Sequence, residues 1–300
     1  MQATFIKSGA ALLCATTLLA SVITAPACAA AHKNAATASA QTRSAVQSQD
    51  TGVQEAQSLP LKGHILEAGV AIAPPFVIAD KGFNNLSGID IDLINELQRR
   101  TGFELSGGRI HLMNFSELLY VSASGALDIT GGAISLSQER EGNYRFSDRS
   151  CLSNAVAVVR ADSSISSLDD LKGKTVAAEV GTTAQDVLPG EYASKVKMRE
   201  SATNFMQFYD VARGHADALV ADHAVAIDYI NYWKDAGLKI AFELPESFSS
   251  IGLLFKKDDM VSAELARAFS EMKQDGTVDA IVDKYIPEYK HSGSRLAGNY

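Results

Sequence analysis

The sequence contains few cysteines. Cys14, Cys28 and Cys151 are the three in 300 residues. Three cysteines cannot form the framework of paired disulfides that stabilises small secreted domains. Beyond the N-terminal region, no apolar run approaches the roughly 20 residues that a membrane-spanning helix needs. We therefore expect a chain that folds around a buried hydrophobic core, with length enough for one large domain or two of about 100–150 residues.

Basic residues are outnumbered as well. The chain has 27 Lys and Arg against 35 Asp and Glu, and its formal net charge is -8. An acidic chain is a poor partner for nucleic acid. The sequence also lacks a G-x-S-x-G, an H-E-x-x-H and a Walker motif, which are typical of hydrolases, zinc proteases and nucleotide-binding proteins. From these absences we expect no nucleic-acid partner, no cofactor and no metal.

The N-terminus differs from the rest. Lys7 is the one charge in the first 31 residues, residues 10–25 are apolar with Ser and Thr interruptions, and Ala27-Cys28-Ala29 resembles a cleavage site. This order predicts a secretory signal peptide at 1–29 and an exported protein. In the alternative interpretation, Cys28 is the lipid-anchored residue of a lipoprotein. With the signal peptide and its cysteines removed, Cys151 would be a lone thiol in an oxidising compartment. We interpret it as a small buried hydrophobe.

The remainder divides into a tether and a folded region. Residues 30–61 are rich in Ala, Ser, Thr and Gln and have too little apolar surface to offset the entropy of ordering, so we expect a flexible tether. From Lys62 the pattern alternates between strands and helices, which predicts an α/β fold with largely parallel sheets. We expect strands at 65–72, 127–130, 155–159, 175–179, 218–220 and 253–255, and helices at 91–100 (capped by Asp90), 115–124, 262–273 and 277–285.

One pattern occurs twice. A predicted helix beginning at Phe115 is followed by Gly125-Ala126-Leu127-Asp128, and one beginning near Phe205 by Gly214-His215-Ala216-Asp217. In both places the Asp opens a predicted strand. This echo suggests two lobes built alike, each with a site beyond the carboxyl end of its strand, where open α/β sheets bind ligands.

The segment from Gly131 to Arg140 carries the densest set of candidate binding groups. Glycines after a strand let the backbone approach a ligand closely. Ser135 offers a hydroxyl, and the planar guanidinium of Arg140 suits a carboxylate. Taken alone, the segment is equally typical of a turn followed by a surface arginine.

Other candidates follow later strands. Gly181-Thr182-Thr183 is expected to open a helix whose free N–H groups favour an anion, or to form a plain N-cap. Asp222 follows an apolar strand and is either an ammonium ligand or a helix cap. His215 and His223 match no strong metal motif and are expected to be solvated loop histidines.

Taken in order, these segments resemble the amino-acid-binding periplasmic proteins of ABC importers, the family 3 solute-binding proteins. The resemblance runs from about residue 62 to 286. It is carried by these segments: Pro75-Phe76, Leu86-Ser87-Gly88-Ile89-Asp90-Ile91-Asp92-Leu93, Ser135-Leu136-Ser137-Gln138-Glu139-Arg140, Phe146-Ser147-Asp148, the run from Leu168 to Lys174, Gly181-Thr182-Thr183, and Asp217 with Asp222.

The resemblance implies a two-lobed, type II periplasmic-binding-protein fold of the Venus-flytrap kind, with two hinge crossings at 155–160 and near 250–255. Lobe 1 would comprise 62–156 plus 251–300, and lobe 2 would comprise 157–250. It also implies a monomer that captures an L-amino acid or close analogue and delivers it to an ABC permease in the inner membrane.

The resemblance implies the site as well. A ligand carboxylate would meet Arg140, Ser135 and Thr183, and a ligand ammonium would meet Asp222 and the backbone at Ala133. The side chain of Phe115 would make an apolar contact by packing on the ligand.

The chain departs from its basic-amino-acid-binding relatives near the side-chain pocket. An aromatic residue and an acid of that pocket are replaced by Ala73 and, approximately, Val70. Glu179 is placed where it either faces the ligand side chain or points to solvent. The alternative function on the same fold is a periplasmic cyclohexadienyl or arogenate dehydratase, for which Glu179 or Asp186 would supply the acid.

Overall fold

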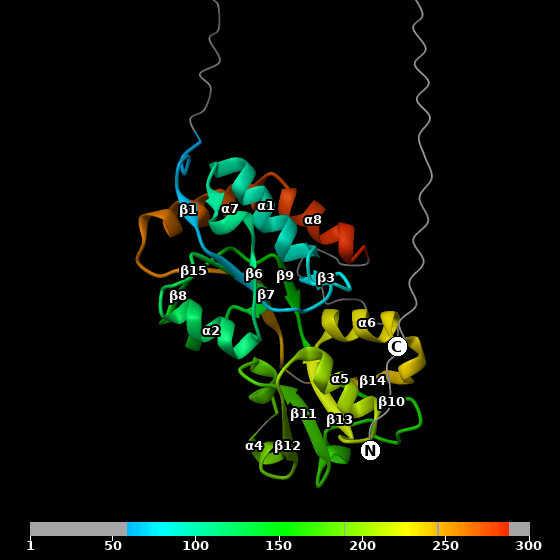
Figure 1. The fold of residues 1–300 in the computed structure, drawn as a ribbon. Helices are drawn as coiled ribbons and strands as arrows, with labels where there is room; N and C mark the ends of the chain where they lie inside the picture. Colours follow the sequence, from blue (N-terminus) through cyan, green and yellow to red (C-terminus); the bar gives the residue numbers. More distant parts are fainter. Residues whose placement is uncertain (1–58, 189, 245, 288–300) are drawn as a thin grey trace, which may run out of the picture. The chain divides into compact units, whose positions relative to one another are not determined.

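The computed structural model describes residues 59–188, 190–244 and 246–287 (Figure 1). The expected signal peptide, the lipid-anchor alternative at Cys28 and nearly all of the expected tether lie outside these residues. Within the described ranges, no helix has both the length and the apolar character required to cross a membrane.

The first sheet has the strand order β6-β2-β7-β15-β8, and β9 also pairs with β15. Neighbours β6, β2 and β7 are parallel, whereas β15 is antiparallel to β7, β8 and β9. The strands are β2 (Ala68–Val70), β6 (His111–Leu112), β7 (Ile129–Ser135), β8 (Tyr144–Phe146), β9 (Cys151–Ser153) and β15 (Ser249–Lys256). Its helices are α1 (Ile89–Thr101), α2 (Phe115–Ala123), α3 (Gln138–Glu141), α7 (Met260–Gln274) and α8 (Thr277–Tyr285).

The second sheet has the order β12-β11-β13-β10-β14. Here β12, β11 and β13 are parallel, and β10 runs antiparallel to both β13 and β14. The strands are β10 (Ala155–Arg160), β11 (Thr175–Glu179), β12 (Lys197–Ser201), β13 (Ala218–Asp222) and β14 (Leu238–Glu243). The helices are α4 (Gly190–Ala193), α5 (Asn204–Ala212) and α6 (His223–Tyr232).

Each sheet therefore combines a parallel part with an antiparallel strand, so the expectation of largely parallel sheets was only partly right. The chain passes from the first sheet to the second at Asn154, between β9 and β10, and returns over residues 244–248, between β14 and β15. The shorter elements are β1 (Ile65–Leu66), β3 (Ile78–Ala79), β4 (Leu86–Ser87) and β5 (Glu104–Leu105), with 3₁₀ turns at Ser106–Gly108, Asp169–Leu171, Thr183–Gln185 and Lys234–Ala236.

The sequence echo has a structural counterpart. Asp128, before β7, accepts a hydrogen bond of 2.8 Å from the backbone N–H of Glu67, which precedes the parallel neighbour β2. Asp217, before β13, accepts one of 2.8 Å from the N–H of Thr175, the first residue of the parallel neighbour β11. Each Asp thus ties together the starts of two parallel strands, which leaves their opposite, carboxyl ends free for a site.

The start of α1 differs from the prediction. Asp90 was expected to cap this helix, but the N-cap is Gly88, and Asp90 lies within the first turn and is fully buried. Gly88 has φ +119°, and a Cβ there would lie 2.4 Å from the carbonyl oxygen of Phe76. Glycine is therefore required at this turn, and Asp90 is released for a different role.

The C-terminal helices agree with the pattern, since α7 and α8 coincide with the expected helices and are separated by Gly276, which has φ +82°. Leu265, Phe269 and Met272 are fully buried as expected. The two helices pack against α1 and each other.

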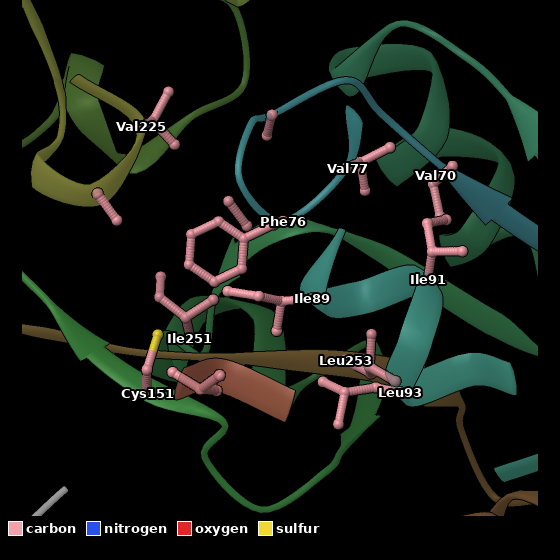
Figure 2. Close-up of a cluster of buried hydrophobic side chains, with 14 of the residues drawn as sticks. Val70, Phe76, Val77, Ile89, Ile91, Leu93, Cys151, Val225, Ile251 and Leu253 are labelled. Atoms are coloured by element: carbon pink, nitrogen blue, oxygen red, sulfur yellow. The ribbon is translucent and has the colours of Figure 1, made fainter. Parts of the chain in front are cut away.

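The core of the first sheet gathers side chains from distant parts of the chain. Figure 2 shows Phe76, Ile89 and Ile251 lying together, with the Cys151 thiol beside Ile251. Cys151 pairs with Ile251 in the β9–β15 register and is 2% exposed. The prediction of a small buried hydrophobe at Cys151 is therefore confirmed, and burial raises the pKa of this thiol.

Candidate functional site

A cavity lies where β7, β11 and β13 end, and both sheets contribute to its lining. All seven residues predicted from the sequence line it. They are Phe115, Ala133, Ser135, Arg140, Glu179, Thr183 and Asp222. The structure thus brings together residues that are up to 107 positions apart in the sequence.

The backbone of β7 changes conformation inside the strand. Gly131 and Gly132 were expected to follow the strand. Instead, they lie within it. Gly132 has φ +136° and Ala133 has φ +55°, and the latter is uncommon for a residue with a Cβ. The carboxylate Oδ2 of Asp90 accepts hydrogen bonds from the N–H of Gly132 (2.7 Å) and of Ala133 (3.1 Å). Asp90 therefore holds the strained segment that lines the cavity.

Burial raises the pKa of Asp90 to about 7, although the two backbone N–H groups act in the opposite direction. Oδ1 of the same carboxyl is buried and has no hydrogen-bond partner among the described residues. The desolvation of the charged form outweighs the two hydrogen bonds. The burial of the Asp90 carboxyl group is therefore unfavourable by itself. Its hydrogen bonds to the backbone of the cavity wall explain why a carboxyl group is present here.

Three hydroxyl groups meet at one side of the cavity. Ser135 Oγ lies 3.2 Å from Thr183 Oγ1 and 3.2 Å from Ser249 Oγ. Ser135 ends β7, whereas Thr183 begins a 3₁₀ turn of three residues after β11. The Gly181-Thr182-Thr183 segment therefore opens a helix of only one 3₁₀ turn, with Thr182 at its N-cap position and no side-chain capping hydrogen bond. A hydroxyl pair of this kind can donate to a ligand oxygen.

Arg140 is 9% exposed and reaches across from α3 to the Gly181 turn. Its Nη1 donates to the Ser135 carbonyl (2.8 Å) and its Nη2 to the Gly181 carbonyl (3.0 Å). Its guanidinium carbon lies 5.6 Å from the centre of the Phe115 ring. Burial lowers the pKa of this guanidinium, yet arginine stays protonated in proteins. The surface-arginine alternative is wrong, because Arg140 is a buried cation on the cavity wall.

Asp222 is the last residue of β13 and directly precedes α6. It occupies the N-cap position of α6, but its side chain makes no capping hydrogen bond, so the helix-cap alternative is right for the position and wrong for the side chain. Burial raises its pKa to about 6, while a hydrogen bond with Ser153 and the charge of Arg140 lower it. At neutral pH the group is predominantly a carboxylate, which can accept hydrogen bonds from an ammonium group.

Glu179 ends β11 and is 2% exposed. Burial raises its pKa to about 8, and a hydrogen bond from the backbone of Asn204 lowers it. Its Oε2 has no hydrogen-bond partner among the described residues. Of the two alternatives for Glu179, the solvent-facing one is wrong, because this carboxyl group lies on the cavity wall.

Sequence reasoning missed two polar residues of the cavity, Asn204 and Gln207, which lie on the first turn of α5. Gln207 Nε2 donates to Asn204 Oδ1 (2.8 Å), whereas Gln207 Oε1 is buried and without a partner among the described residues. The available signal was weak. Thr203 caps α5 by accepting from the N–H of Met206 (3.2 Å), so a capping residue after β12 marked where α5 begins, but not which of its side chains turn inward.

A second, wider cavity of about 810 Å³ shares Phe115 and Glu179 with the first. Apolar and aromatic side chains supply much of its lining, among them Ile78, Leu112, Met113, Phe205 and Tyr229. Four carboxyl groups line it, from Asp80, Glu117, Glu179 and Asp228, together with one ammonium group, from Lys81.

The histidines make no metal site. His215 is exposed, as expected, and its Nδ1 lies 3.2 Å from Asp210 Oδ1. His223 is fully buried at the start of α6, with Nδ1 3.2 Å from Asn154 Oδ1, so the prediction of a solvated loop histidine was wrong there. In the part of the chain that the structure describes, no three His, Cys, Asp or Glu side chains gather as metal ligands.

The protein has two mixed β-sheets, which two passages of the chain join and which line one charged cavity. This arrangement defines a two-lobed solute-binding fold. Residues 66–288 match the bacterial extracellular solute-binding proteins, family 3, and the chain belongs to this family. The family resemblance and the two-lobed fold predicted from the sequence are therefore confirmed.

Relatives span most of the described region. The L-cystine-binding protein TcyA of Bacillus subtilis (strain 168) is 28% identical over 237 residues, which are 77% of this chain and 84% of the relative. The arginine-binding extracellular protein ArtP of the same organism is 25% identical over 206 residues, 68% of this chain and 79% of its own. The structure of an ancestral arginine-binding protein bound to arginine has a TM-score of 0.67 and 30% identity, and covers 74% of this chain and 97% of its own.

Proposed function

We propose that this protein captures an L-amino acid, or a close analogue, in the first cavity and delivers it to the permease of an ABC transporter. The observation that carries the proposal is the pairing of opposite charges on one cavity: the guanidinium of Arg140 and the carboxylate of Asp222 line it together. A zwitterion has one group for each of them. The amino-acid-binding relatives support the same class of ligand.

In this proposal the ligand carboxylate binds Arg140 and the hydroxyl pair of Ser135 and Thr183. The guanidinium has five N–H donors and uses two of them on backbone carbonyls. The ligand ammonium binds Asp222 and the carbonyl oxygen of Ala133, whose orientation is set by its positive φ. The ring of Phe115 packs against the ligand.

Ligand capture is proposed to close two lobes over the cavity. Lobe 1 comprises residues 62–156 plus 251–300, and lobe 2 comprises 157–250. The two passages of the chain between the sheets, at Asn154 and over 244–248, support a hinge of two crossings. Ser135 and Thr183, which are proposed to bind the ligand carboxylate, lie at or just after the ends of strands from different sheets. A bound carboxylate would therefore favour the closed arrangement.

The compartment and partner follow from the family. We propose a periplasmic protein, with residues 1–29 as its signal peptide, that acts as a monomer and docks on an inner-membrane permease. The relatives are named as binding proteins, which supports a function without catalysis. The relatives named above give no support to the dehydratase alternative.

A thermal-shift screen of the purified protein against the common L-amino acids tests this function. A ligand present at 100 times its dissociation constant adds about 2.7 kcal/mol to the free energy of unfolding, so a cognate amino acid should raise the melting temperature by several degrees. Calorimetry should then give a 1:1 complex. Absence of binding by every amino acid in both assays would contradict the proposal.

A further inference from the structure

Two buried hydrogen-bond acceptors on the cavity wall lack donors. Oε2 of Glu179 and Oε1 of Gln207 are buried, their residues are each 2% exposed, and neither atom has a partner among the described residues. Glu179 comes from the end of β11 and Gln207 from α5, which packs against β11. An unmet buried acceptor is unfavourable, so two on one wall indicate a ligand that brings N–H groups to them.

The charges of the first cavity also leave one group unmatched. One guanidinium, from Arg140, faces two carboxyl groups, from Asp222 and Glu179. In the proposed function, Arg140 binds the ligand carboxylate and Asp222 binds the ligand ammonium. Glu179 then has no opposite charge beside it, and a carboxyl group buried there needs one in order to ionise. A third charge on the ligand, of positive sign, would supply it.

The second cavity extends this asymmetry past Glu179. Three further carboxyl groups line it, from Asp80, Glu117 and Asp228, against the ammonium of Lys81. The rings of Phe115 and Tyr229 line it too, and aromatic faces attract cations. A side chain that passes Glu179 therefore enters a space whose charge and walls favour a cation over an anion.

We propose that the ligand is an amino acid with a cationic side chain, whose N–H groups bind the carboxylate of Glu179 and the amide oxygen of Gln207. The inference rests on the proposed function, because it assumes that the carboxylate and ammonium of the ligand occupy Arg140 and Asp222. It assigns Glu179 and Gln207 as specificity-determining residues.

The affinity should depend on pH. Burial raises the pKa of Glu179 to about 8, and a cationic ligand binds its ionised form, so binding releases a proton near neutral pH. Affinity should be about tenfold higher at pH 8 than at pH 6.5. The other titratable or charged groups lining the two cavities are Arg140, Asp222, Asp80, Lys81, Glu117, Asp228, Tyr229 and Tyr232.

The test is calorimetry on the purified full chain at pH 8. L-Arginine, L-lysine and L-ornithine are compared with L-glutamine, L-leucine, L-glutamate and L-cystine. We expect the tightest binding from a basic amino acid, at least tenfold tighter than from any other. Glu179→Gln should weaken that binding at least tenfold and remove its pH dependence, and Gln207→Leu should weaken it several-fold. The matched control is Glu104→Gln, at an exposed glutamate of β5, which should bind as the wild type does.

The outcomes separate the two proposals. Tightest binding of a neutral or acidic amino acid, or of cystine with its distal zwitterion, would overturn the cationic class while the proposed function stands. Binding of a basic amino acid that is the same in Glu179→Gln, with the same pH dependence, would overturn the assignment of Glu179. Binding of no amino acid would overturn the proposed function and this inference with it. Circular dichroism of each variant verifies that it is folded.

Discussion

Asp90 holds Ala133 by a hydrogen bond across 43 positions of the chain. Its Oδ2 accepts the N–H of Ala133 at 3.1 Å and that of Gly132 at 2.7 Å. Ala133 has φ +55° and lies on the cavity wall. The buried carboxyl group of α1 therefore maintains a backbone conformation that the proposed ammonium site requires.

The first prediction concerns this positioning. Asp90→Ala should weaken amino-acid binding about tenfold or more, because two buried N–H groups lose their acceptor and the Ala133 carbonyl loses its orientation. Asp90→Asn keeps an acceptor oxygen and should bind within about threefold of the wild type. Calorimetry on folded variants gives both values. Equal binding by the Ala variant would show that β7 keeps its shape unaided.

The second prediction concerns stability and pH. The folded-state pKa of Asp90 is raised from 3.8 to about 7, so the folded protein binds more protons than the unfolded chain between these values. Stability should therefore fall as pH rises through this window and level off above it. Across this window, Asp90 lowers the free energy of unfolding by up to about 4 kcal/mol. Urea unfolding at pH 4 to 8 should show a shallower decline for Asp90→Asn than for the wild type, and parallel curves would count against it.

The third prediction concerns Arg140. Arg140→Ala should nearly abolish amino-acid binding, since loss of a buried charge partner costs about 2–5 kcal/mol, or about 30-fold to several-thousand-fold in affinity. Arg140→Lys should restore only part, because an ammonium group cannot form the paired geometry of a guanidinium. Calorimetry with the cognate ligand decides the matter.

Its control is Arg99→Ala. Arg99 is exposed and pairs with Glu96 within α1, so this variant should bind normally. Arg100 is a poorer control, because it joins α1 to Asp275 and Thr277. Binding by Arg140→Ala within about threefold of the wild type would refute the carboxylate assignment.

The fourth prediction concerns Asp222. Asp222→Asn keeps the shape but removes the charge that faces the ligand ammonium, and should weaken binding by about 30-fold or more. Desamino analogues of the cognate ligand should bind the wild type equally poorly. In a double-mutant-cycle comparison, the variant should discriminate little between ligand and analogue. Undiminished discrimination would place the ammonium elsewhere.

The fifth prediction concerns chemistry. Prephenate or arogenate incubated with the protein should remain unchanged. Of the two acids considered for a dehydratase, Asp186 is exposed and absent from the first cavity, and Glu179 would have to act alone. Chromatography should detect no phenylpyruvate or phenylalanine. Product formation that Glu179→Gln abolishes would instead indicate an enzyme.

Local patterns predicted several of the longer elements well. Gly276 separates α7 from α8, and their apolar residues recur at helical spacing, so propensity and periodicity suffice there. The family resemblance also predicted which side chains line the first cavity, from Phe115 to Asp222, at the edge where the carboxyl ends of parallel strands meet. Their contacts with a ligand stay a prediction.

By itself, then, the amino-acid sequence determined the alternation of strands and helices, the family and the candidate residues. Tertiary structure decided what the polar residues near helix starts do. Asp90 has the local pattern of a helix cap, His223 that of a loop histidine, and Gln207 no pattern at all. Each is buried by segments distant in sequence. The burial of a polar group, and hence its pKa and its partners, depends on what the rest of the chain packs against it.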